Sequence, residues 1–353
     1  SKYFNAVIWT GTDTGTSRSF SGLQFAPDLW WSKTRSQAYG NQLFDSVRGA
    51  GSTKALSSDQ TAAEGAGNGA TYGYLSSFDA NGVTYTRGSA GSGSNPDGYA
   101  YYDELSATYV AWAWNAGGST VTNTAGTISA QVRANTTSGF SIVQWSGSGA
   151  NATIGHGLGA TPAFIMVKDR SSGTNGGAVY HTSMGATKYL KLFQTTTGTD
   201  AEATDNTAWN GSSPTFNTNV FSVGSLARTN SSGTSNMIAY IFAPVNGFSA
   251  FGSFTGNGSA DGPFIYLGFE PKYFMIKRTD AASDWVVLDS ARNLYNVANA
   301  SLYPNLDVAE GTAYSYDFLS NGFKNRNTAV NVNGGTYIYA AFAEFPFKYS
   351  RAF

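Results

Sequence analysis

The residues best suited to chemistry occur at one matched position in three similar segments of the chain. Asp45, His181 and Asp289 each follow two apolar residues and precede a Ser or Thr. Carboxylate and imidazole groups at such a position could bind a ligand or move a proton. The alternative is a buried polar side chain that caps a turn or pairs with a nearby Lys or Arg. Because the position changes from Asp to His, the segments do not share one chemistry, and we favour the structural interpretation.

Each segment also contains a lysine and an arginine close together, upstream of the matched position. They are Lys33 and Arg35, Lys168 and Arg170, and Lys277 and Arg278. These cations could belong to a ligand site. We interpret them instead as charges at strand ends or as salt-bridge partners.

No acidic pair is singled out as suitable for hydrolysing glycosidic bonds. Glycosidases need two carboxylates held at a set separation in a cleft. Asp103 with Glu104, and Asp307 with Glu310, are close in sequence, but both pairs are expected in turns. The chain also shows no Gly-x-Ser-x-Gly elbow, phosphate-binding loop or dinucleotide-binding fingerprint ahead of a helix. We predict that the protein is not an enzyme and uses no cofactor.

Metal binding has little support in the sequence. Cysteine is absent, and the two histidines, His156 and His181, cannot form a closed metal site by themselves. His156 stands between glycines in a turn, so we expect it to face solvent or to bond to the backbone. Residues 257–262 supply oxygen atoms but lack the 12-residue pattern of a calcium loop. We therefore predict no metal site.

Residues 87–104, here called the tyrosine loop, have no counterpart elsewhere in the chain. They contain a strong turn signal, Asn-Pro-Asp-Gly, followed by Tyr99, Tyr101 and Tyr102. Amphipathic aromatic side chains on a loop can stack on sugar rings or pack into a partner chain. We select these three tyrosines and Asp97 as candidate ligand or partner contacts. The alternative is a hairpin that packs its tyrosines on its own domain.

One short hydrophobic run must position the matched residues. It begins at Pro27, Pro162 or Pro271 and ends six residues later at a lysine. Its length, the Gly-rich turn before it and its aromatic and β-branched content favour a strand. Proline fits only at the start of such a strand. Because both alternating sets of residues are apolar, the strand is predicted to be central in its sheet and covered on both faces.

These runs belong to three repeats. Each repeat has a short opening strand, the Pro-to-Lys run, the matched polar position, a tight-turn signal and a closing aromatic strand. Many short strands with Gly and Asn turns indicate a sandwich, and a repeat of about 100 residues has the size of one such domain. The predicted fold class is all-β, with three tandem similar β-sandwich domains of jelly-roll or lectin-like type.

The predicted domains span residues 1–118, 139–246 and 247–353. Residues 119–138, which are rich in Thr, Ser, Asn and Gly, are predicted to form a linker. Almost no linker separates the second and third domains, so we expect those two to pack rigidly together.

The composition indicates an uncharged surface. Charged residues make up only 12% of the chain, and the net charge is −1, whereas soluble domains usually contain about 25% charged residues. No basic face indicates nucleic acid or a membrane surface, and no apolar run approaches the ~18 residues of a membrane span. We predict no nucleic-acid partner and no membrane insertion. Hydroxyl and amide groups must dominate the polar surface, which is typical of extracellular or virion β-proteins.

Several motifs resemble a repeat family of predicted structural proteins from marine and cyanobacterial phages. The matching segments are residues 155–170, 44–49, 109–114 and 254–262. The resemblance covers all three repeats and implies a virion component, often of tail-fibre or appendage type. The first repeat departs from the family pattern by the tyrosine loop.

These observations lead to one preferred function and two alternatives. The preferred function is a virion appendage protein (tail fibre, spike or capsid fibre), extracellular, which displays β-domains for host attachment through surface glycans. The first alternative is a purely structural fibre or capsid-decoration protein without a ligand, and the less favoured second is a polysaccharide depolymerase. Exposed strand edges must be paired or blunted, so we expect a homo-oligomer, by fibre analogy a trimer, together with other virion proteins as partners.

Overall fold

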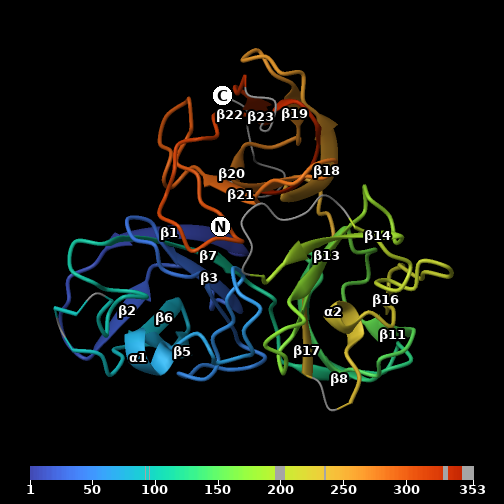
Figure 1. Ribbon diagram of the computed structural model, residues 1–353, viewed down its shortest axis with the longest axis horizontal. Helices are drawn as coiled ribbons and strands as arrows, with labels where there is room; N and C mark the ends of the chain where they lie inside the picture. The colour runs from blue at the N-terminus through green and yellow to red at the C-terminus, as the bar shows by residue number, and fades with distance from the viewer. Residues whose placement is uncertain (92, 95, 195–202, 234–235, 329–332, 344–353) are drawn as a thin grey trace.

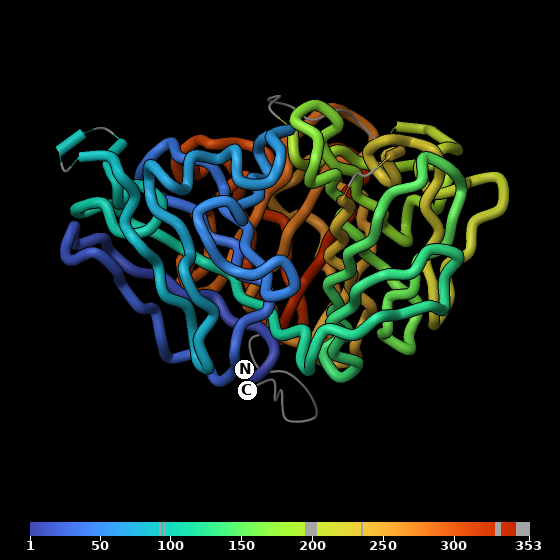
Figure 2. Tube along the Cα trace, turned by 90° about the horizontal axis from the view of Figure 1, so that it is seen from below, coloured from blue at the N-terminus to red at the C-terminus, as the bar shows by residue number. Residues whose placement is uncertain are grey.

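The chain folds into three β-rich lobes around a common axis. The computed structural model describes residues 1–353 except 92, 95, 195–202, 234–235, 329–332 and 344–353. Each lobe corresponds to one sequence repeat (Figure 1). Seen from below, repeat 1 (blue) and repeat 2 (green) lie next to each other, with repeat 3 (orange) behind them (Figure 2). Helix in the described part of the chain is limited to short turns such as α1 (Gly69–Tyr72) and α2 (Ala227–Asn230), so the predicted all-β class is confirmed.

Repeat 1 is a sandwich of two antiparallel sheets. Its inner sheet, which faces the axis, has the strand order β1 (Phe4–Thr10), β7 (Thr108–Trp114), β3 (Leu29–Thr34) and β4 (Gln42–Asp45). Its outer sheet has the order β2 (Ser17–Ser21), β6 (Gly82–Thr86) and β5 (Tyr74–Asp79). Trp30 and Phe44 of the inner sheet meet Val83 and Tyr85 of the outer sheet in a core that belongs to repeat 1 alone.

Repeat 2 has the same plan with a wider inner sheet. The order of that sheet is β15 (Ala203–Thr204), β14 (Lys188–Leu192), β13 (Gly177–His181), β12 (Phe164–Asp169), β17 (Asn236–Phe242), β10 (Phe140–Ser146), β9 (Ala130–Asn135) and β8 (Val121–Asn123). The outer pair is β11 (Ala152–Gly155) with β16 (Val220–Val223). Ile165 and Phe221 meet in the core between the two layers.

Repeat 3 returns to the four-plus-three arrangement of repeat 1. The inner sheet has the order β18 (Ser249–Thr255), β24 (Thr336–Ala343), β20 (Pro271–Arg278) and β21 (Val286–Asp289). The outer sheet has the order β19 (Phe264–Tyr266), β23 (Gly322–Asn325) and β22 (Tyr316–Leu319). The Phe274 ring of the inner sheet stacks on Phe323 of the outer sheet at 4.3 Å between centroids.

Tight turns join the outer-sheet strands where the sequence shows Asn-Gly. In repeats 1 and 3 these turns connect β5 to β6 and β22 to β23. A Cβ atom on Gly82 would lie 1.8 Å from the carbonyl oxygen of Phe20 on β2, and one on Gly322 would lie 2.0 Å from that of Ile265 on β19. Only glycine permits this approach of the neighbouring strand.

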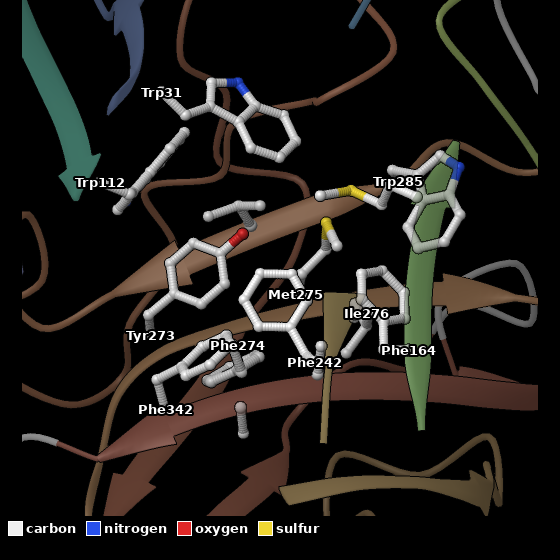
Figure 3. Packing of buried hydrophobic residues seen from close by; sticks show 14 of the residues in the cluster. Trp31, Trp112, Phe164, Phe242, Tyr273, Phe274, Met275, Ile276, Trp285 and Phe342 are labelled. Atoms are coloured by element: carbon white, nitrogen blue, oxygen red, sulfur yellow. The ribbon is translucent and has the colours of Figure 1, made fainter. Parts of the chain in front are cut away.

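The three inner sheets meet in one axial core. Trp31, Met166 and Met275 occupy equivalent positions of β3, β12 and β20, and all three are buried in it. The Phe342 ring of repeat 3 lies 5.6 Å from Trp114 of repeat 1 and 5.4 Å from Phe242 of repeat 2, between ring centroids. Figure 3 shows the aromatic and methionine side chains gathered there. The remaining void is about 10 Å³, about the size of one water molecule, so it offers no ligand chamber.

The Pro-to-Lys strand has the predicted environment. β3, β12 and β20 each have a neighbour on both sides, and every residue of β3 and β12 is buried. Within β3, Trp31 enters the axial core while Trp30 enters the core of its own sandwich. Apolar residues on both faces are therefore explained by burial against two different layers.

Residues 119–138 are not a linker, in contrast to the sequence prediction. They contain β8 and β9, which extend the inner sheet of repeat 2 beyond β10. Ala130 and Val132 are buried while Gln131 between them is exposed, which is the alternation of a strand with one solvated face. The polar composition concealed this short alternation. We call residues 121–135 the cover segment.

We expect the three repeats to unfold in one transition, because they share the axial core. Phe342→Ala should lower the free energy of unfolding by about 3–5 kcal/mol, as for other large aromatic deletions from a core. Calorimetry would show one peak moved to lower temperature. Two or three separated peaks, with only one of them shifted, would mean that the repeats are independent domains.

Candidate functional site

The matched polar residues are turn caps buried between repeats. Asp45, His181 and Asp289 end β4, β13 and β21, and all three are 0% exposed. Each accepts a hydrogen bond from a backbone N–H two or three residues later, as in Ser183 N to His181 Nδ1. The structural interpretation of this position is therefore confirmed, and no ligand can reach it from solvent.

The same side chains join each repeat to the next. Asp45 Oδ2 of repeat 1 accepts a hydrogen bond from Tyr240 Oη of repeat 2 at 2.8 Å. Asp289 Oδ2 of repeat 3 accepts one from Trp112 Nε1 of repeat 1 at 2.9 Å. His181 of repeat 2 contacts repeat 3, so the three contacts follow one another around a closed ring.

The change from Asp to His has a direct chemical cause. His181 Nε2 lies 3.1 Å from the Tyr339 carbonyl oxygen, and its Nδ1 is occupied as an acceptor by the Ser183 N–H. The Nε2 nitrogen therefore carries the proton and donates it to that carbonyl. Ala340 stands where repeat 1 has Trp112, so repeat 3 offers an acceptor where the other repeats offer a donor. Burial lowers the pKa of His181 to about 4, which keeps the imidazole neutral.

The residue three positions after the cap depends on whether the cap is charged. Asp45 and Asp289 form buried ion pairs with Arg48 and Arg292, three residues later. At the same offset from the neutral His181, the chain has Met184. A buried carboxylate needs an opposite charge and a neutral imidazole does not, so this position supplies an arginine only where a carboxylate requires one.

The predicted salt-bridge role of the arginines is confirmed. Arg170 of repeat 2 pairs with Glu64 of repeat 1, and Arg35 of repeat 1 pairs with Glu310 of repeat 3 at 2.9 Å. Arg278 pairs within repeat 3. The two glutamates also contact the buried arginines of their own repeats, so each links two repeats.

The three lysines lie close to the ends of their strands, as predicted, and are buried hydrogen-bond donors. Lys33 Nζ donates to the Asp307 carbonyl oxygen of repeat 3 at 3.3 Å, and Lys168 Nζ donates to the Thr61 carbonyl oxygen of repeat 1 at 2.7 Å. Lys277 donates to a carbonyl of its own strand. Burial lowers the pKa of both Lys33 and Lys168 to about 8. Lys33 and Lys168 thus cap loops of the neighbouring repeat, and Lys277 does not share this role.

The remaining titratable candidates also have structural partners. Asp103 forms an ion pair with Arg18, and Glu104 shares a hydrogen bond with Tyr39. His156 is buried, with Nε2 3.1 Å from a backbone carbonyl oxygen. It therefore has the expected backbone bond without facing solvent. Among the described residues, no group of three or more His, Asp and Glu side chains is arranged to hold a metal ion.

The tyrosine loop packs on its own domain. Tyr99 and Tyr102 are 4% and 0% exposed and belong to the core of repeat 1. Asp97 is also buried and caps the Tyr99 N–H. Tyr101 is half-buried against the Tyr72 ring. Of the four selected contacts, only Tyr101 has side-chain surface that a ligand could reach without movement of the loop.

The sequence reasoning missed a hollow on repeat 2, because its walls fall partly in the predicted linker. This polar hollow has a volume of about 230 Å³ and is lined by Ser129, Gln131, Gln144, Trp145, Ser146 and Asn236. Gln131 pairs with Gln144 across β9 and β10, and Ser146 pairs with Asn236 across β10 and β17. The side chains therefore project from three adjacent strands of one sheet. The alternation around Gln131 was the sequence signal that could have located it.

The polar hollow is uncharged and has free hydrogen-bonding capacity. Gln144 Oε1 accepts a hydrogen bond from Arg170 at 2.9 Å, which directs its Nε2 donors toward other partners. Gln131 Nε2 donates to Thr122 Oγ1 at 3.0 Å, which leaves its oxygen as an acceptor. Trp145 turns its ring into the sandwich core, where Nε1 donates to Asn230. The hollow can thus bind hydroxyl groups but offers no aromatic platform.

Comparison with known proteins identifies a family without an assigned activity. Residues 1–346 match the model of a domain of unknown function, DUF7483. No curated protein and no solved structure matches the chain. The family match spans all three repeats, in agreement with their shared core. Within the described residues, no helix has both the length and the apolar character needed to cross a membrane.

We expect His181→Asp to be strongly destabilising and His181→Asn to be mild. A carboxylate would face the Tyr339 carbonyl oxygen without a counter-charge, at a loss of about 3–5 kcal/mol, whereas the Asn amide can still donate. Urea denaturation of both variants at pH 7 measures the difference. Equal losses would contradict the donor role.

The same residue should produce an acid limb in the stability profile. The unfolded state takes up a proton near pH 6.5 and the folded state only near pH 4, so stability falls as the pH drops through this window, by up to about 3 kcal/mol. His181→Asn should reduce the slope between these two values, and part of it should remain because burial also lowers the pKa of His156. An unchanged slope in that variant would assign the acid limb to other groups.

We also expect the protein to become more stable as the pH rises from 8 to 9.5. Lys168 titrates near pH 8 when folded and near 10.5 when unfolded, so the unfolded state binds more protons across this interval. Lys168→Met should reduce the gain in the urea midpoint, while Lys2→Met, an exposed control, should keep it. A gain equal to wild type in Lys168→Met would show that this lysine stays charged in the fold.

Proposed function

The chain belongs to the DUF7483 family, and we propose that it is a non-enzymatic attachment protein of a phage particle that binds a neutral glycan in the polar hollow of repeat 2. The observation that carries this proposal is the hollow itself, with its uncharged lining of carboxamides and hydroxyls. Neutral sugars offer closely spaced hydroxyl groups that both donate and accept hydrogen bonds. Paired glutamine groups provide the complementary donor and acceptor.

The hollow is held in a fixed shape by contacts to repeat 1. Arg133, on the cover segment, pairs with Asp28 at 2.6 Å, and Asn135 Nδ2 donates to Asn115 Oδ1 at 2.8 Å. β9 is thereby anchored to repeat 1 through side chains on one of its faces, and its backbone pairs with β10. A wall that is already ordered loses little conformational entropy when a ligand binds.

The size of the hollow limits the ligand. A volume of about 230 Å³ is below the ~300–1,000 Å³ of sites for drug-sized molecules, so it suits one sugar unit of a longer glycan. Single contacts of this kind would be weak. Many copies on one particle would raise the overall avidity by ~10²–10⁴-fold.

The location on a phage particle is supported by the motif resemblance and by the uncharged composition. Neighbouring virion proteins and a host-surface glycan are the corresponding partners. Three of the four acidic candidates for catalysis, Asp103, Glu104 and Glu310, are engaged in contacts between or within repeats, which favours binding over hydrolysis.

A purely structural role is the second candidate, and a different surface favours it. Nine large hydrophobic side chains are exposed in the described part of the chain, and six of them are on repeat 3, namely Phe264, Tyr266, Leu294, Tyr295, Val297 and Val308. Such a concentration on one repeat is typical of a contact surface.

We expect wild-type protein to bind selected neutral glycans on an array and to leave their chain length unchanged. Gln131→Ala combined with Asn236→Ala should weaken binding at least tenfold, because both side chains line the hollow and are exposed. Gln24→Ala, an exposed glutamine on repeat 1, is the matched control. Full binding by the double variant would remove the hollow from consideration, and absence of any glycan binding would favour the structural role.

A further inference from the structure

The opening strand has an equivalent position in each of the three inner sheets. Among the described strands, only repeat 2 has a further strand that covers its outer edge. β1, β10 and β18 are the equivalent opening strands, each paired on one side with the closing strand of its repeat. On its other side β10 pairs with β9 of the cover segment over residues 140–145. β1 and β18 are at the sheet edge. An open edge must be blunted or covered, since its free N–H and C=O groups can pair with another strand.

Repeat 1 blunts this edge with its own side chains. The Gly11 N–H donates to the Ala107 carbonyl oxygen, and the Tyr3 carbonyl oxygen accepts from the Asn115 N–H, so odd-numbered residues bond on the β7 side. The even-numbered residues of β1 therefore point their backbone N–H and C=O groups away from β7. The Ala6 N–H donates to Asn5 Oδ1 at 3.0 Å, and the Thr10 carbonyl oxygen accepts from Arg18 at 3.0 Å. The edge of β1 is thus partly occupied and carries a cation.

Repeat 3 has no such protection along most of β18. Gly256 N and the Phe248 carbonyl oxygen bond toward the closing strand, so even-numbered residues bond on that side. The odd-numbered residues Phe251, Ser253 and Thr255 therefore point their N–H and C=O groups outward. Within the described residues these six groups have no partner. β18 contains no charged residue and no proline, the two devices that commonly prevent strand addition.

We propose that β18 pairs with β18 of a second copy of this chain, antiparallel, about a twofold axis at Ser253. In this register Ser253 faces its own copy, and Phe251 faces Thr255 on both sides of the axis. The three residue pairs are of the hydrogen-bonded type, so all six free backbone groups are satisfied by six hydrogen bonds.

The strand fits itself better than it fits a charged partner. Its central residues, Gly252 and Ser253, are small and uncharged, so neither like charges nor bulky side chains meet at the axis itself. Exposed Phe264 and Tyr266 on β19, the edge strand of the outer sheet and the next strand in the chain, add apolar surface to the same repeat. A twofold contact uses one patch twice and closes, so the result is a dimer rather than the trimer expected from fibre analogy.

A cysteine at the proposed axis tests the pairing directly, because the chain contains no cysteine. Residues opposed in a hydrogen-bonded antiparallel pair have Cα atoms about 5.5 Å apart, which is within the reach of a short bismaleimide cross-linker. Ser253→Cys should therefore form a covalent dimer when this cross-linker is added. Ile8→Cys is the matched control, since Ile8 is 45% exposed and occupies the same register position on β1; it should stay largely monomeric.

Light scattering of the unmodified chain and of Ser253→Lys completes the test. The wild type should have twice the 37.2 kDa mass of one chain. Ser253→Lys, which places two like charges opposite each other, should halve that mass without a change in melting temperature or in glycan binding. A wild type of single-chain mass, or equal cross-linking of Ser253→Cys and Ile8→Cys, would overturn the proposal and leave the edge to a different chain.

Discussion

The structure depends on the fact that each inner sheet has two apolar faces and its own sandwich covers only one of them. Trp30 enters the core of repeat 1, while Trp31 on the same strand needs a cover that repeat 1 cannot supply. Three such faces around one axis cover each other completely. Burial of this axial surface, driven by the hydrophobic effect, therefore requires all three repeats at once.

Packing the three sheets around the axis also buries polar strand ends. Each of these polar groups has its own hydrogen-bond partner in the next repeat. The cap at the end of β4, β13 or β21 is an acceptor or a donor according to what the next repeat presents. The arginine three residues later accompanies the carboxylate and is absent beside the histidine. What varies among the repeats is thus whether the cap accepts or donates the hydrogen bond, while its place at the strand end stays the same.

The features that recur among the repeats could be predicted from the sequence. The Pro-to-Lys strand, the Asn-Gly turns, the polar cap and the three-sandwich class were all predictable, because hydrophobic runs and turn residues act locally. Three other features depend on tertiary context. The cover segment has only a short apolar alternation, the tyrosine loop could pack inward or outward, and the donor role of His181 requires knowledge of Ala340 on a distant strand.

Covalent fusion of the three repeats removes the equivalence that a ring of separate chains would impose. A true homotrimer would carry each surface three times, whereas in the described part of this chain the tyrosine loop and the polar hollow belong to repeats 1 and 2, and the open β18 edge belongs to repeat 3. Each feature belongs to one lobe, and the axial core constrains only the inward faces of the lobes. The three sides of the molecule therefore differ from one another. One lobe can contact a partner while another lobe faces solvent.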